Sequence, residues 1–145
     1  MKFYIAGPMT GLPDFNYPEF NKAADELRKQ GYKVVNPAEL DGGDTSMTWT
    51  YYIKRDLKEL LDCQGIVLLK GWEKSKGANI EVFVAKALGY MIYIQTESGY
   101  KQINSEQLKP DSVLTEAHDN KLPFVWLALR LAGSATNPRE ITGWT

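Results

Sequence analysis

Two carboxylates and one loop are the parts of this 145-residue chain best suited to chemistry. Glu81 follows the segment Ser75–Ile80, and Asp56 lies on an expected helix just before an apolar run. One carboxylate can attack the anomeric carbon of a sugar, while a second holds the sugar or moves a proton. Two carboxylates beside a sugar would therefore have a clear chemistry.

The segment from Ser75 to Glu81 is typical of a loop that runs into the start of a helix. Free N–H groups at a helix N-terminus attract anions, and Lys74 and Lys76 add positive charge. A phosphate would fit this place. The structural alternative is that Ser75 or Asn79 caps the helix, that the lysines are solvated, and that Glu81 only complements the helix dipole.

A second glycine-containing segment, Gly7-Pro8-Met9-Thr10-Gly11, follows the first expected strand. Glycine lets backbone approach a ligand closely, although Gly-Pro after a strand is also an ordinary turn. Asp56 has its own structural alternative as a surface carboxylate beside Arg55. Packing or surface roles are expected for Cys63 and His118, and no metal site is expected because no ligand cluster surrounds them.

Expected strands alternate with expected helices along the first two thirds of the chain. The strands cover residues 2–6, 32–35, 65–69 and 90–94, and the helices cover 18–30, 49–61 and 80–88, with 72–79 as a loop. This alternation predicts βαβ units with right-handed crossovers. We therefore expect a single-domain α/β core over residues 1–95. Its parallel sheet carries helices on both faces and is Rossmann-like, with a flavodoxin-like strand order.

Residues 96–145 have a different pattern and are expected to form a C-terminal extension, irregular at first and then helical. Residues 122–132 are apolar enough for a helix. The extension is expected to pack on the core or on a partner subunit. In an open parallel sheet, ligands bind beyond the carboxyl ends of the strands, so the site is expected there and not in the extension.

Composition narrows the class of protein. The 17 basic and 18 acidic residues give a net charge of −1, which lacks the basic excess typical of duplex nucleic-acid binding. No apolar run approaches membrane-spanning length, and a single cysteine allows no internal disulfide. These features favour a soluble cytoplasmic protein with no membrane contact. Walker, G-x-S-x-G and G-x-G-x-x-G motifs are absent from the sequence.

Several short motifs, taken in order, resemble the nucleoside 2-deoxyribosyltransferase superfamily, which includes the nucleoside 5′-monophosphate N-glycosidases. They are Phe3–Met9, Asp56, Ser75-x-Gly77-x-Asn79-x-Glu81 and Leu88-Gly89. The resemblance covers about residues 2–95. It is strongest to small phage and bacterial proteins of uncharacterised function that start Ala-Gly-Pro-Met-Thr-Gly, and a phage origin would mean the host cytoplasm.

The resemblance implies a role for each matching residue. Glu81 would be the nucleophile, and the Tyr4 hydroxyl would hold it in place. Asp56 would help the departing base or orient the sugar, and Ser75 would bind phosphate. The other substrate-binding positions would be Gly7, Pro8, Met9, Gly77 and Asn79.

The expected activity is cleavage of the N-glycosidic bond of a (deoxy)nucleoside 5′-monophosphate without a cofactor, with hydrolysis preferred over transfer. The alternatives are a protein that sequesters a nucleotide or a nucleotide signal, and a scaffold for a protein partner. Active sites of the resembled superfamily usually borrow residues from a neighbouring subunit, so a homo-oligomer, at least a dimer, is expected. The sequence does not specify the base or the sugar.

Overall fold

The computed structural model describes residues 1–108, which form an α/β fold around one five-stranded sheet. The strand order is β2-β1-β3-β4-β5. The strands are β1 (Lys2–Ala6), β2 (Lys33–Val35), β3 (Gly65–Leu68), β4 (Met91–Thr96) and β5 (Gly99–Ile103). The first four are parallel, and β5 runs antiparallel to β4. The α/β class and the flavodoxin-like order are confirmed.

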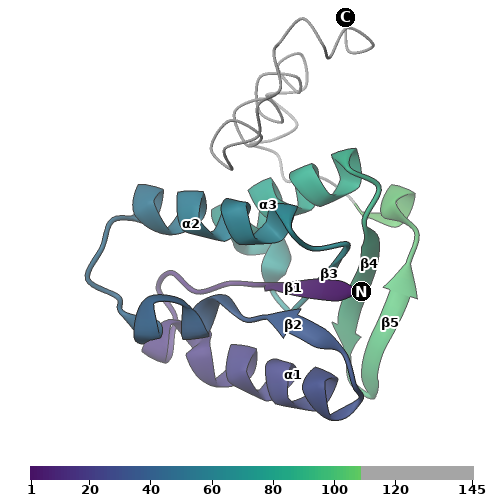
Figure 1. Ribbon diagram of the computed structural model, residues 1–145, viewed down its shortest axis with the longest axis horizontal. Coiled ribbons are helices and arrows are strands. Elements are labelled where there is room, and N and C mark those ends of the chain that lie inside the picture. Colours follow the sequence, from purple (N-terminus) through teal and green to yellow (C-terminus); the bar gives the residue numbers. More distant parts are fainter. Residues whose placement is uncertain (109–145) are drawn as a thin grey trace, which may run out of the picture.

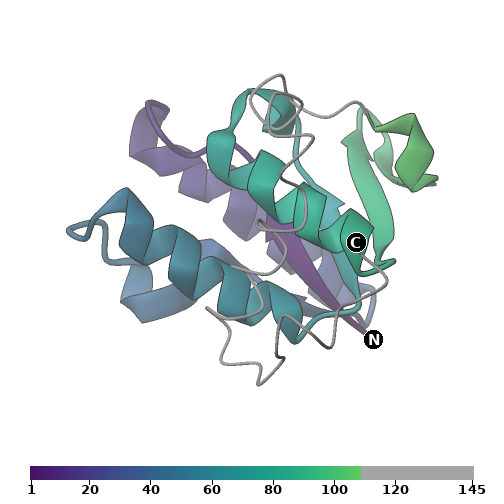
Figure 2. The same ribbon diagram turned by 90° about the horizontal axis from the view of Figure 1, so that it is seen from above.

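Within residues 1–108, three α-helices cover the two faces of the sheet. Helix α1 (Tyr17–Lys29) lies on one face, while α2 (Trp49–Leu61) and α3 (Lys76–Ala87) lie on the other (Figure 1). From above, α2 and α3 lie next to each other across the sheet (Figure 2). Short 3-10 segments complete the connections: η1 (Pro13–Asn16), η2 (Pro37–Gly43), η3 (Trp72–Lys74) and η4 (Ser105–Gln107).

Strand β1 divides its side chains between the two cores. Because successive strand residues point to opposite faces, Phe3 and Ile5 pack with α1, whereas Tyr4 and Ala6 pack with α2 and α3. Tyr4 is fully buried. The alternation of β1 therefore sends a phenol hydroxyl to the face whose helices carry Asp56 and Glu81.

Helix α3 begins earlier than its sequence predicts. The expected loop at 72–79 ends at Ser75, whose Oγ accepts a hydrogen bond from the Ala78 N–H at 3.1 Å. The Asn79 amide then donates to the carbonyls of Glu73 at 2.9 Å and Ser75 at 2.8 Å. These bonds satisfy the polar groups of the η3–α3 turn and allow the helix to start at Lys76. Glu81 consequently lies in the second turn of α3, not in the first turn as expected.

The sheet also extends beyond the core that the sequence predicts. Irregular chain is expected after residue 96, yet Gly99–Ile103 forms β5 through a tight hairpin. Thr96 Oγ1 donates to the Gly99 carbonyl at 3.1 Å and closes this turn. The expected helix at 122–132 and His118 lie outside the described residues. Within residues 1–108, no helix is long and apolar enough to cross a membrane.

Candidate functional site

A cavity of about 980 Å³ lies at the carboxyl ends of β1 and β3. Its walls come from the segment after β1, from Lys70 and Gly71 after β3, and from the first turns of α2 and α3. The chain leaves β1 towards α1 and leaves β3 towards α3, on opposite faces of the sheet. Such a switch point is where doubly wound sheets bind their ligands.

Tyr4, Asp56 and Glu81 all line this cavity, each from a different element. Tyr4 is 0% exposed, Glu81 is 5% exposed and Asp56 is 9% exposed. The Tyr4 hydroxyl donates a hydrogen bond to Glu81 Oε2. The three residues that the resemblance assigns to catalysis therefore lie together in one cavity. Asp56 is buried, so the structural alternative of a surface carboxylate beside Arg55 is wrong.

Burial controls the protonation of this cluster. Loss of water raises the pKa of Glu81 well above its usual range, and the Asp56 charge raises it further. The Tyr4 hydrogen bond and the Arg55 charge act in the opposite direction. Burial likewise raises the pKa of Asp56 to about 6. Burial thus favours the protonated form of Glu81 in the free protein, and not the anion that its structural alternative as a partner of the helix dipole implies.

Arg55 is the one cation in direct contact with the cluster among the described residues. Its Nε and NH2 groups lie 3.0 Å and 2.9 Å from Asp56 Oδ1. One cation thus faces two buried carboxylates, and a net neutral cluster retains one proton. Sequence reasoning treats Arg55 only as a neighbour of Asp56; the signal that was present is an Arg-Asp pair on the inward side of an amphipathic helix.

The start of α3 forms a polar wall of the cavity. Ser75 and Gly77 both line it, together with Lys74 and Lys76. Ser75 Oγ accepts from Ala78 N–H, which leaves the hydroxyl hydrogen for another partner. A Cβ on Gly77 would lie 3.7 Å from the nearest protein atom, so packing does not require glycine there. The structural alternative for Ser75, a helix N-cap, is confirmed, and the cap faces the cavity.

Of the remaining predicted substrate-binding residues, three line the cavity and one only supports the local backbone. Gly7, Pro8 and Met9 line the cavity. A Cβ on Gly7 would approach Leu69 Cβ to 2.9 Å, so close packing between strand ends explains this glycine. Asn79 does not line the cavity; it is 3% exposed and its amide holds the turn before α3.

Sequence reasoning misses an apolar rim around the mouth of the cavity. Trp49, Met47, Leu12 and Phe15 line the cavity and keep 40%, 48%, 41% and 45% of their surfaces exposed. The Lys76 ammonium lies 4.3 Å from the centre of the Trp49 ring. The available signal was a group of large apolar residues just before the expected helix at 18–30 and at the start of the expected helix at 49–61.

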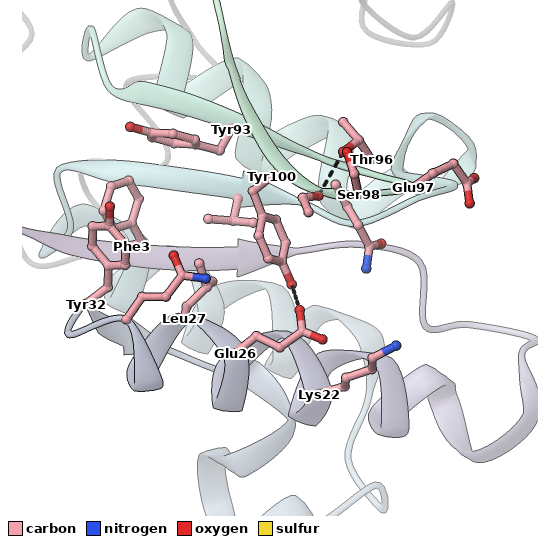
Figure 3. A pocket seen from close by; sticks show the side chains of 14 residues that line it. Phe3, Lys22, Glu26, Leu27, Tyr32, Tyr93, Thr96, Glu97, Ser98 and Tyr100 are labelled. Atoms are coloured by element: carbon pink, nitrogen blue, oxygen red, sulfur yellow. Dashed lines mark hydrogen bonds between the residues drawn. The ribbon is translucent and has the colours of Figure 1, made fainter.

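A second cavity, of about 620 Å³, lies on the α1 side of the sheet (Figure 3). Its central polar contact is another tyrosine–glutamate pair: the Tyr100 hydroxyl donates to Glu26 Oε2 at 2.9 Å. Both side chains are partly exposed. The other glutamate of its lining, Glu97, extends into solvent and pairs with Lys70.

The fold and the first cavity define a parallel α/β protein with a buried tyrosine–dicarboxylate cluster at its switch point. The chain belongs to the family described as a domain of unknown function (DUF4406), whose model matches residues 1–94. No curated protein matches the chain. Because the family description names no activity, the deoxyribosyltransferase resemblance stays a prediction. In the described part of the chain, no group of three or more His, Cys, Asp or Glu side chains is placed to hold a metal ion.

Proposed function

We propose that this protein hydrolyses the N-glycosidic bond of a (deoxy)nucleoside 5′-monophosphate, with Glu81 as the nucleophile. The observation that carries the proposal is the burial of Tyr4, Asp56 and Glu81 together at a switch-point cavity. Two carboxylates that share a proton supply both a nucleophile and an acid. A cavity of about 980 Å³ has ample room for a nucleotide.

In the first step, the proton held by the cluster moves from Glu81 to Asp56 and then to the departing base. The Glu81 carboxylate attacks the anomeric carbon as the bond from that carbon to the base nitrogen breaks. The products are the protonated free base and a sugar ester of Glu81. Tyr4 keeps one Glu81 oxygen fixed through its hydrogen bond, so that the other oxygen faces the sugar.

In the second step, water attacks the same anomeric carbon and the ester bond to Glu81 breaks. Asp56, now ionised, takes the water proton, and the cluster returns to its starting charge. Free sugar 5-phosphate is released. A second base in place of water would give transfer instead of hydrolysis, with the same proton count.

The 5′-phosphate is assigned to the start of α3. Backbone N–H groups of this first turn, the Ser75 hydroxyl and the lysines at 74 and 76 supply donors and positive charge. A phosphate fixed there would orient the sugar towards Glu81, one helical turn further along α3. Orientation of this kind can contribute several kcal/mol to the rate.

Assembly into a homo-oligomer is part of the proposal. The exposed apolar rim of Leu12, Phe15, Met47 and Trp49 supports it, because such groups on a cavity mouth favour contact with a second surface. Sedimentation velocity at micromolar concentration is expected to give a dimer or a larger species. A monomer under these conditions would contradict this part of the proposal.

The test is incubation with a panel of ribo- and deoxyribonucleoside 5′-monophosphates, followed by chromatography of free base. Wild type is expected to release base from at least one of them, and E81Q from none. Glu26→Gln, which changes the tyrosine-paired glutamate of the other cavity, is the matched control. Absence of base release together with tight calorimetric binding would favour nucleotide sequestration. Absence of both would favour the scaffold alternative.

A further inference from the structure

Arg55 lines the cavity beside Asp56 and has no role in the reaction steps proposed above. Its side chain is 13% exposed, and its guanidinium contacts Asp56 through two nitrogens. The same group donates to the Pro37 carbonyl at 3.3 Å and lies 5.0 Å from the centre of the Tyr52 ring. A planar, forked donor suits these simultaneous contacts, whereas a lysine ammonium would satisfy only some of them.

Arg55 also reaches the chain segment that walls the cavity mouth. Its NH1 group lies 3.5 Å from Asp41 Oδ2, and the Tyr51 hydroxyl donates to the same oxygen at 2.6 Å. Tyr52 adds a hydrogen bond from its hydroxyl to the Asp44 carbonyl at 2.9 Å. Residues 41–48 are therefore held to the first turns of α2, and Thr45 and Met47 of this segment line the cavity.

We infer that Arg55 is a positioning residue for the glycosidic cleavage proposed above. It fixes the direction and charge of the Asp56 carboxylate, and it couples that carboxylate to the 41–48 segment at the mouth. This inference rests on the proposed function, because it assigns to Asp56 the handling of the proton. Arg55 acts through Asp56 and is given no contact with the reacting atoms.

Among the charged groups of residues 1–108 that surround Asp56, Arg55 is the one that favours its ionised form by opposite charge. The titratable and charged groups that act on it come from three elements besides its own: Tyr4 of β1, Glu81 of α3 and Tyr17 of α1, together with Arg55 and Glu59 of α2. Arg55 is the cation of this set, and its charge and hydrogen bond oppose the effect of burial on the Asp56 pKa. Its removal leaves Asp56 facing Glu81 and Glu59 with only the Tyr4 hydroxyl as a favourable partner.

The test compares wild type with R55Q, R55K and a control, R28Q. Arg28 of α1 forms an exposed ion pair with Glu39 of η2 and does not line the cavity, so R28Q removes an equivalent charge outside the site. Asp56 is titrated by carbon-13 NMR of its side-chain carboxyl in the free protein, and turnover is followed by base release.

R55Q is expected to raise the Asp56 midpoint by at least about one pH unit and to move the acid limb of kcat by the same amount. R55K is expected to keep the midpoint near wild type and to lower kcat about tenfold with little change in KM, because the charge remains and the fork is lost. R28Q should match wild type in every measurement. Should R55Q fail to fold, the split between kcat and KM in R55K decides the question.

An unchanged Asp56 midpoint in R55Q, or full kcat in R55K, would overturn the inference. A wild-type protein that releases no base contradicts the proposed function alone. In that case the Asp56 titration still tests whether Arg55 stabilises the charge of that carboxylate.

Discussion

Two cavities in residues 1–108 each contain a tyrosine that donates to a glutamate, and the pairs differ in what surrounds them. On the α2–α3 side, Tyr4 and Glu81 are buried and lie against a second carboxylate. On the α1 side, Tyr100 and Glu26 are partly exposed (Figure 3). The residue types are the same, so the difference in chemistry comes from the environment.

Burial of the carboxylates separates the two pairs. Burial raises the pKa of both tyrosines, and two carboxylates add to that effect in each case: Asp56 and Glu81 for Tyr4, and Glu26 and Glu19 for Tyr100. Asp56 and Glu81 are buried, whereas Glu26 and Glu19 reach solvent. A buried pair of carboxylates must keep a proton, whereas a half-exposed glutamate can use water to stabilise its charge. The difference between the pairs is therefore a second carboxylate that is itself buried, which makes the Tyr4–Glu81 pair a potential acid–nucleophile site.

Exchange of the two glutamates for glutamine gives the largest expected contrast. Glu81→Gln removes the nucleophile and is expected to lower kcat by about a thousandfold or more. Glu26→Gln makes the same change in the half-exposed pair and should leave kcat unaltered. Steady-state base release measures both. Equal losses in the two variants would remove the distinction between the cavities.

Replacement of Asp56 by asparagine should lower kcat by about 10²- to 10⁴-fold, the range for loss of a positioned acid–base group. In wild type, kcat is expected to rise with pH through about 6, because below the Asp56 pKa both carboxyls are protonated and neither can attack. A substrate phosphate also titrates near this pH. Loss of the limb in D56N assigns it to Asp56, whereas a limb that persists assigns it to the phosphate.

The two glycines at the cavity give a contrast in stability. Gly7→Ala is expected to cost about 1–3 kcal/mol, because the new Cβ would lie 2.9 Å from Leu69 Cβ. Gly77→Ala should be neutral or stabilising by up to about 1 kcal/mol, because its Cβ meets only ordinary contacts inside a helix. Urea unfolding measures both. In G77A an increase in KM for a nucleotide is expected, since the methyl group enters the cavity.

A last expected effect is on the pH dependence of stability. The unfolded pKa of Asp56 is near 3.8 and the folded value is about 6, so between these values the folded protein binds more protons. Asp56 therefore makes stability fall as pH rises through this window, by up to about 1.4 kcal/mol per unit. Glu81, whose pKa burial also raises, adds a slope of the same sign. D56N should reduce the slope to the share of Glu81, and the surface variant E39Q should not reduce it. A wild-type stability that rises over the same window would contradict the burial of these two carboxyls.

The sequence predicts most of the framework because its signals are periodic. The apolar spacing of residues 49–61 predicts α2 with its observed bounds, and continuous apolar runs predict β3 and β4 to within a residue or two. Strand β5 has no such signal: Gly99–Ile103 is polar because the sheet edge leaves Lys101 and Gln102 exposed. Its formation depends on the β4 pairing, which only the folded chain provides.

The sequence predicts which residues lie together at the candidate site, but it does not predict the raised pKa of Glu81. Motif order correctly gathers Tyr4, Asp56, Ser75 and Glu81 around one cavity. The early start of α3, set by the hydrogen bonds of Ser75 and Asn79, moves Glu81 away from the helix end and into the core. A shift of one helical turn changes the sign of its expected pKa displacement, and no pattern in the sequence reveals it.

The most direct test of the central claim is detection of a covalent sugar on Glu81. A 2′-fluoro-2′-deoxynucleoside 5′-monophosphate with the base favoured in the panel would serve as the probe, because fluorine slows breakdown of the sugar ester. Intact mass spectrometry is expected to show a gain equal to one fluorinated sugar phosphate, located by digestion to the peptide that contains Glu81. Base release from this probe with no adduct, or with an adduct on another residue, would contradict the role of Glu81 as the nucleophile.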